Sequence, residues 1–192
     1  PQESLWAYNN PGLAEQALNM LVEKQIDADF IDPDSLLRAD VQQGVLAVAD
    51  MRYKVLVLPA LTCVRRSTAK QIETFVENGG RVVVLNRWPD DTMESGKNDK
   101  ALVKFRKKLE KKRVTNIDLK KLPDEVEKVL DRDVTMNGTG AKELRYQHVQ
   151  REGKDIYWIA NNAKTPADCE IRFRAAGAAS LWQPEDGSIT PI

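Results

Sequence analysis

The chain has 192 residues, of which 42% are hydrophobic and 30% are charged, and its 29 basic residues equal its 29 acidic residues. This composition is typical of a globular protein with one good core or two small ones. The balanced charge gives no overall attraction to nucleic acid or to a membrane surface, and no apolar run is long enough to cross a bilayer.

The first third of the chain predicts short helices and strands in alternation. Residues 12–24 carry an apolar stripe at helical spacing, and residues 28–31 are typical of a short strand. A helical turn follows, with Asp34 or Ser35 as its cap. Residues 44–49 predict a second short strand.

The most regular pattern lies between residues 53 and 85. Two continuous apolar runs, residues 55–58 and 82–85, are typical of strands that are covered on both faces. Between them a helix is expected to begin near Ser67 and to end at Asn78-Gly79-Gly80. This order predicts one right-handed crossover of a parallel sheet. We expect its main core to consist of Val55, Val57, Phe75, Val82, Val83 and Val84.

Further elements extend the alternation to about residue 130. The sequence predicts helices at residues 99–112 and 119–130, with a strand at residues 114–116 between them. Residues 1–132 are therefore interpreted as an α/β domain with a doubly wound, mainly parallel sheet.

The pattern then changes to antiparallel β. Residues 133–141, which include Gly138 and Gly140, are expected to be a linker. Within residues 142–192, two strands around Glu152-Gly153 predict a hairpin, and three shorter strands follow. We expect this segment to be an incomplete β-sandwich.

A cysteine nucleophile is one hypothesis for activity. Cys63 follows the first apolar run and stands beside Arg65 and Arg66, which would favour its thiolate. The only histidine, His148, lies in the antiparallel segment, so an ordinary half-buried cysteine is favoured. A disulfide between Cys63 and Cys169 is also disfavoured.

Other kinds of site receive weaker support. The two glycines at positions 79 and 80 precede a strand, whereas a phosphate loop follows one. Clustered aspartates suit helix capping better than calcium binding. Seven basic residues in the ten positions of residues 104–113 fit a solvated helix face better than a nucleic-acid site. We therefore assign no catalytic, cofactor-binding or metal-ligating residue. The clustered aspartates, for which helix capping is favoured over calcium binding, are Asp27, Asp29, Asp32, Asp34, Asp90 and Asp91.

Three aromatic residues are candidates for sugar contact. Trp6, Tyr8 and Trp88 fall in predicted loops or near strand ends, where an aromatic ring can stack on a sugar. Packing in the core or at a domain interface is the favoured role for these rings, and sugar contact is the alternative.

Several motifs, taken in chain order, carry a family resemblance. Together they resemble the region that follows the catalytic barrel in large bacterial α-L-rhamnosidases of glycoside hydrolase family 106. The motifs are Ser4-Leu-Trp-Ala-Tyr8, Ala28-Asp-Phe-Ile-Asp-Pro-Asp-Ser-Leu36, Tyr53-Lys-Val-Leu-Val-Leu-Pro59, Phe75-Val-Glu-Asn-Gly-Gly80, His148, Asp155-Ile-Tyr-Trp-Ile-Ala-Asn161 and Leu181-Trp-Gln-Pro-Glu-Asp-Gly187.

The resemblance implies a flavodoxin-like or glutamine-amidotransferase-like module beside β-sandwich domains. It places the catalytic carboxylates in a barrel that is absent from this chain, so that no catalytic residue is carried over. It also implies that the chain is a fragment of a secreted or periplasmic enzyme. Its partners would be the other domains of that enzyme, with carbohydrate as a further ligand.

Three functional hypotheses follow. The first is a non-catalytic accessory module that supports the barrel of a carbohydrate-active enzyme. The second is a carbohydrate-binding module. The third is an independent hydrolase or amidotransferase-like enzyme that uses Cys63.

Overall fold

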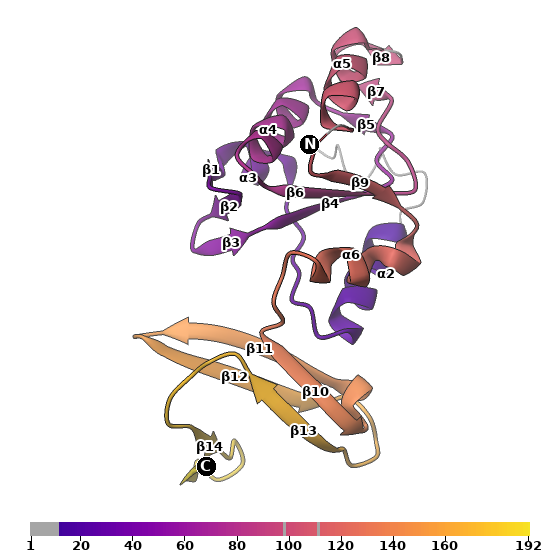
Figure 1. Ribbon diagram of the computed structural model, residues 1–192. Helices are drawn as coiled ribbons and strands as arrows, with labels where there is room; N and C mark the ends of the chain where they lie inside the picture. The colour runs from indigo at the N-terminus through magenta and orange to yellow at the C-terminus, as the bar shows by residue number, and fades with distance from the viewer. Residues whose placement is uncertain (1–11, 98, 111) are drawn as a thin grey trace. The chain divides into compact units, whose positions relative to one another are not determined.

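The computed structural model describes residues 12–97, 99–110 and 112–192 (Figure 1). The chain divides into two compact units, Pro1–Asp131 and Arg132–Ile192, which we call unit 1 and unit 2. Among the described residues, no helix has the length and apolar character needed to cross a membrane.

A three-stranded parallel sheet forms the centre of unit 1 (Figure 1). Strand β6 lies in the middle and is parallel to both of its neighbours. Two helices make the crossovers, α4 between the first two strands and α5 between the last two. These elements are β4 (Val55–Pro59), α4 (Arg66–Glu77), β6 (Arg81–Leu85), α5 (Lys100–Leu109) and β9 (Val114–Ile117).

Helices cover both faces of this sheet. Because side chains alternate along a strand, Val82 and Val84 face one apolar cluster, while Val83 and Leu85 face the other. The first cluster includes residues of α3 (Pro33–Arg38), α4 and α5. The second includes residues of α2 (Gly12–Glu23) and α6 (Leu122–Glu127), which follows the 3-10 turn η1 (Leu119–Lys121).

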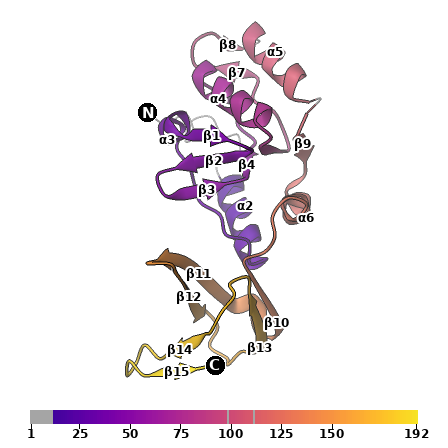
Figure 2. The same cartoon turned by 60° about the vertical axis from the view of Figure 1, so that its left-hand side comes forward.

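The prediction of a flavodoxin-like, doubly wound sheet is wrong. A doubly wound sheet reverses its strand order at a switch point, whereas the order β4-β6-β9 proceeds in one direction, with both crossover helices on one face. Residues 28–31 form no strand. The expected strand at residues 44–49 instead belongs to an antiparallel sheet (Figure 2). That sheet comprises β1 (Asp40–Gln42), β2 (Val45–Val48) and β3 (Met51–Tyr53).

The third sheet of unit 1 is small and contains both parallel and antiparallel pairs. Strand β7 pairs in parallel with β5 and antiparallel with β8. Each strand has two residues, and β7 and β8 lie between β6 and α5 in the chain. The strands are β5 (Cys63–Val64), β7 (Asp91–Thr92) and β8 (Gly96–Lys97).

Local chemistry explains where the helices begin and end. Asp32 caps α3, because its Oδ1 accepts bonds from the backbone amides of Asp34 and Ser35, both at 2.9 Å. The cap is thus Asp32 and not the two residues that were predicted. Helix α4 ends as predicted: Gly79 has φ +99°, and the amide of Gly80 donates to the carbonyl of Phe75 at 2.9 Å.

Unit 2 consists of three antiparallel strand pairs and a turn of 3-10 helix (Figure 2). Strand β10 occupies most of the segment that was expected to be a linker. The predicted hairpin is present as β11 and β12. The elements are β10 (Val134–Thr139) with β13 (Asp168–Phe173), η2 (Ala141–Glu143), β11 (Leu144–Arg151) with β12 (Lys154–Asn161), and β14 (Ser180–Trp182) with β15 (Ile189–Pro191).

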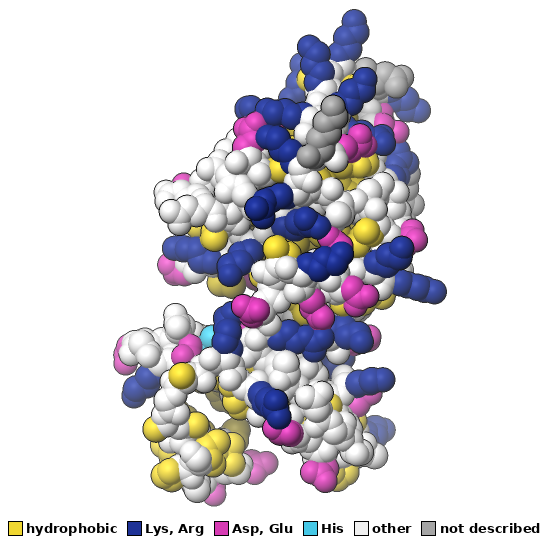
Figure 3. Space-filling model, in the orientation of Figure 1, with side chains coloured by type: hydrophobic (Ala, Val, Ile, Leu, Met, Phe, Trp, Pro, Cys, Tyr) yellow, Lys and Arg dark blue, Asp and Glu magenta, His cyan; other side chains and the backbone are white. Residues whose placement is uncertain are grey.

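The core of unit 2 is small. Its buried residues are Val134, Met136, Ala141 and Leu144, and partly buried residues of β11, β12 and β13 pack against them. The pairs β10–β13 and β11–β12 therefore share one apolar cluster between them. By contrast, Leu181, Trp182 and Ile189 on β14 and β15 are exposed, and hydrophobic side chains gather there in Figure 3.

Candidate functional sites

In an open α/β sheet, the active site commonly lies at the carboxyl ends of the parallel strands. Ala60 and Asn86 follow β4 and β6, and both have left-handed backbones, with φ of 50° and 62°. The amide of Asn86 donates to the carbonyl of Ile117 at 2.9 Å. Arg87 pairs with Asp90 at 2.7 Å. These groups are engaged with one another and present no nucleophile beside a base.

The structure does not support Cys63 as a nucleophile activated by His148. Cys63 is half-buried in β5 of unit 1, whereas His148 lies on β11 of unit 2. Both ring nitrogens of His148 already contact aspartates. Cys63 and Cys169 are both thiols and do not form a disulfide.

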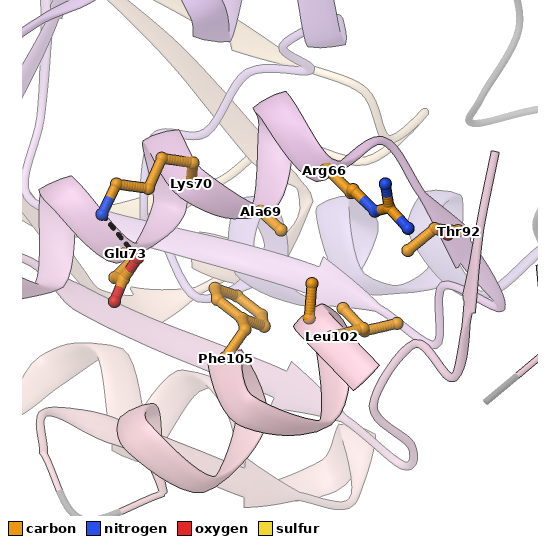
Figure 4. A pocket seen from close by; sticks show the side chains of 8 residues that line it. Arg66, Ala69, Lys70, Glu73, Thr92, Leu102 and Phe105 are labelled. Atoms are coloured by element: carbon orange, nitrogen blue, oxygen red, sulfur yellow. Dashed lines mark hydrogen bonds and ion pairs between the residues drawn. The ribbon is translucent and has the colours of Figure 1, made fainter. Parts of the chain in front are cut away.

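A shallow pocket of about 130 Å³ lies between α4 and α5 (Figure 4). Ala69, Leu102 and Phe105 contribute its apolar lining. Its charged groups are neutralised locally, since Lys70 Nζ lies 2.9 Å from Glu73 Oε2. The pocket is therefore best described as a groove between two packed helices.

Asp99 anchors the polar end of this pocket. It receives hydrogen bonds from the hydroxyl of Thr92 at 2.6 Å, from Nε of Arg66 at 2.8 Å and from the amide of Ala101 at 2.7 Å. The Thr92 bond, together with Arg66 and Ala101, holds the pKa of Asp99 well below its usual range, although burial opposes the shift. The Asp99 carboxylate thus caps α5 and ties β7 to α4, which is a structural role.

The basic helix α5 is partly neutralised by α4. Lys108 forms ion pairs with Glu73 and Glu77, and Arg106 pairs with Glu110. Lys108 lowers the pKa of Glu73, and it also lowers that of Glu77. Lys and Arg side chains still gather around α5 in Figure 3. The pairing of Lys108 and Arg106 with glutamates agrees with the interpretation of α5 as a solvated face.

A buried ion pair joins the parallel sheet of unit 1 to helix α6. Arg81 of β6 pairs with Glu125 of α6, and Glu125 also accepts a bond from Lys128. Burial raises the pKa of Glu125, but the bonds from Lys128 and Arg81 lower it by more, so that the net shift is downward. This carboxylate is therefore an ionised structural anchor between β6 and α6.

The clustered aspartates have separate structural partners. Asp34 pairs with Arg65 at 2.7 Å, and the hydroxyl of Tyr53 donates to Asp29 at 2.9 Å. Burial and then this hydrogen bond raise the pKa of Tyr53 to about 12. Within the described part of the chain, no group of three or more histidine, cysteine or acidic residues is arranged to hold a metal ion.

The aromatic candidates for sugar contact fall in different places. Trp6 and Tyr8 lie outside the described residues, so their contact with sugar stays a prediction. Trp88 is only 5% exposed and lies edge-on to Phe105, with ring centroids 6.3 Å apart. The structure therefore places the Trp88 ring in the core and not on a sugar-binding surface.

Sequence reasoning missed a polar cluster around His148. His148 Nδ1 lies 2.7 Å from Asp133 Oδ2, and Nε2 lies 2.9 Å from Asp155 Oδ1. The imidazole stacks on Tyr157 with centroids 4.1 Å apart, and Arg174 lies 3.2 Å from Asp133. Both ring nitrogens of His148 therefore lie within hydrogen-bond distance of a carboxylate oxygen.

This cluster, which we call the His148 cluster, joins the β10–β13 pair to the β11–β12 pair in unit 2. His148, Asp155 and Tyr157 come from the β11–β12 hairpin, whereas Asp133 and Arg174 flank β10 and β13. Tyr157 also packs against Phe173, with centroids 4.6 Å apart. Burial, and then the charge of Asp133, raises the pKa of Tyr157. Asp133 lies 15 or more residues from each of its partners in the sequence. No local spacing could therefore predict its contact with His148.

Two known proteins are similar to this chain, one in sequence and one in fold. A "Putative beta-glucuronidase" of Formosa agariphila is 26% identical over 171 residues, which is 85% of this chain and 14% of that protein. The apo exo-carrageenase GH42 from Bacteroides ovatus has a similar fold, with a TM-score of 0.62 and 14% identity over 95% of this chain and 25% of that one. The chain thus spans a small part of both proteins.

The family model for glycoside hydrolase family 106, described as alpha-L-rhamnosidase, matches residues 11–192. This match covers nearly the whole chain and agrees with the order of motifs in the sequence. The chain therefore belongs to glycoside hydrolase family 106.

Proposed function

We propose that this chain is a non-catalytic accessory region that supports a catalytic barrel located elsewhere in a longer glycoside hydrolase. The observation that carries the proposal is the state of its ionisable groups. Asp99, Glu125 and the His148 cluster each join separate elements of the fold through hydrogen bonds and ion pairs. Groups held in this way stabilise a scaffold and are not arranged around a reacting bond.

The size of the relatives supports the same proposal. The chain corresponds to 14% of the curated relative and to 25% of the carrageenase chain, which leaves most of each protein for other domains. The partners we propose are accordingly the catalytic barrel and the β-sandwich of the same polypeptide, in a secreted or periplasmic enzyme.

Turnover by the isolated chain tests the proposal. The 192-residue chain is incubated with aryl α-L-rhamnosides, aryl β-glucuronides and rhamnose-containing pectic oligosaccharides, and release of the aryl group or of free sugar is measured. We expect no release above that of a heat-denatured control. Sustained turnover that is proportional to protein concentration would show that the chain carries its own active site.

A further inference from the structure

One face of the β11–β12 hairpin carries an exposed aromatic residue. In this antiparallel pair, Gln147 is opposite Trp158 and Val149 is opposite Ile156. These four side chains point away from the face that holds Tyr146, His148 and Tyr157. Trp158 is 55% exposed, Val149 41% and Ile156 37%. The hairpin thus presents an indole beside an amide and two aliphatic side chains.

The same face is positively charged. The next pairs along it are Arg145 with Ala160 and Arg151 with Lys154. The four cross-strand pairs of this face therefore contain three cations and no carboxylate. The carboxylate of Asp155 lies on the opposite face, where it contacts His148.

The three cations lack a carboxylate partner among the described residues. The guanidinium of Arg145 donates to the backbone carbonyls of Lys142 and Leu144, at 2.7 and 2.9 Å, which fixes its position without neutralising its charge. Arg151 and Lys154 are exposed beside the turn at Glu152-Gly153. From Arg145 to Arg151 the strand rises about 20 Å, at roughly 3.3 Å per residue.

We propose that this face, which we call the Trp158 face, binds an anionic glycan. The indole of Trp158 would stack on one sugar ring, since an exposed aromatic face suits the C–H surface of a pyranose. Gln147 would hydrogen-bond its hydroxyl groups. Arg145 at one end, and Arg151 with Lys154 at the other, would bind carboxylate or sulfate groups along the glycan.

Charge complementarity and the family together favour this ligand. An acidic peptide or a nucleic acid would satisfy the cations, but membership in a glycoside hydrolase family favours a sugar chain. The proposal does not depend on the accessory role, because a glycan can bind this face whether or not the chain has an active site.

Binding is tested on the 192-residue chain by isothermal calorimetry. The probes are oligogalacturonate, which bears carboxylates, and carrageenan oligosaccharide, which bears sulfates. A neutral dextran oligosaccharide of similar length and a thymidine oligonucleotide serve as comparisons. We expect binding to one or both anionic glycans at low salt, several-fold weaker binding at about 0.5 M NaCl, and little binding to the two comparison ligands.

Matched variants locate the site. Trp158→Ala should weaken binding about tenfold or more, as expected for truncating a central aromatic contact. Arg151→Gln combined with Lys154→Gln should weaken binding several-fold and reduce its salt dependence. The controls are Trp182→Ala, which removes a 68% exposed indole from β14, and Arg172→Gln, whose arginine pairs with Glu170. Both controls should bind as the parent chain does.

Several results would overturn the proposal. These are no heat with either anionic glycan at millimolar concentration, equal affinity for the oligonucleotide, or equal losses from Trp158→Ala and Trp182→Ala. Circular dichroism and thermal melting of each variant separate a lost contact from a lost fold. A turnover result leaves this test unaffected, so the failure of one proposal is distinguishable from the failure of the other.

Discussion

Substitution Gly80→Ala should destabilise unit 1 by overpacking its main core. A Cβ atom at Gly80 would lie 2.3 Å from Cε2 of Phe75 and 2.4 Å from two other ring atoms. Two carbon atoms pack best at about 3.5 Å or more, so the ring would have to move by about 1.2 Å. Phe75 is fully buried, with Ile72 and Val82 in the same cluster. We expect a cost of about 1–3 kcal/mol in the free energy of unfolding.

Urea melts followed by tryptophan fluorescence, to which the buried Trp88 contributes, and by circular dichroism measure this cost. Gly79→Ala is the matched control, because Gly79 has φ +99° but its added Cβ would meet nothing closer than 3.8 Å. That substitution should cost about 1 kcal/mol through backbone strain alone. The two adjacent glycines thus separate a steric clash from an unfavourable backbone angle.

A smaller residue at position 75 tests the cause of the clash. In a Phe75→Leu background the cost of Gly80→Ala should fall by about 1 kcal/mol or more, while the cost of Gly79→Ala should not change. Equal costs of Gly80→Ala in both backgrounds, or a cost below about 0.5 kcal/mol in the parent chain, would refute the reasoning.

Three further predictions concern charge and turn geometry. The pKa of Asp99 is held below its ordinary value of 3.8, so its ionised form stabilises unit 1 above that pH, and this stabilisation is lost as the pH falls. Acid titration of the unfolding midpoint should therefore show a shallower loss below about pH 4 in Asp99→Asn, and an unchanged profile would contradict this role. His148→Gln should destabilise unit 2 by about 1–3 kcal/mol, because it weakens bonds to the half-buried carboxylates of Asp133 and Asp155. Hydrogen exchange of unit 2 amides measures this loss, and unaltered protection would contradict it. Glu152 has φ 52° in the hairpin turn, so Glu152→Asn should stabilise the hairpin by a few tenths of a kcal/mol, whereas Glu152→Val should destabilise it; thermal melts in which the two variants match would refute the assignment.

The elements that the sequence predicted well are those whose signals are local. The apolar run at residues 82–85 is fully buried in β6, and Gly79 ends α4 with a left-handed backbone, as its position in the sequence indicated. The hairpin around Glu152-Gly153 also formed where turn chemistry placed it. In each case the pattern within about ten residues determines the structure.

The errors concern features that depend on distant contacts. A strand of three or four residues, such as β2, is too short to show whether its neighbours run parallel or antiparallel. This is why the predicted strand at residues 44–49 was assigned to the parallel sheet and not to the antiparallel one. For Trp88, core packing was favoured over sugar contact, and the buried ring lies edge-on to Phe105 in agreement with that expectation. The His148 cluster also depends on Asp133 and Arg174, which flank β10 and β13 and lie 15 or more residues from His148 in the sequence.

The stacking of His148 on Tyr157 provides an intrinsic reporter for unit 2. The chain contains one histidine, so its imidazole gives a single pair of ring-proton resonances without isotopic labelling. The neighbouring phenol, with its centroid 4.1 Å away and its plane tilted by 12°, should displace these resonances through its ring current. Any glycan or adjoining domain that distorts the hairpin would move this pair of signals, and the movement can be followed while the rest of the spectrum stays crowded.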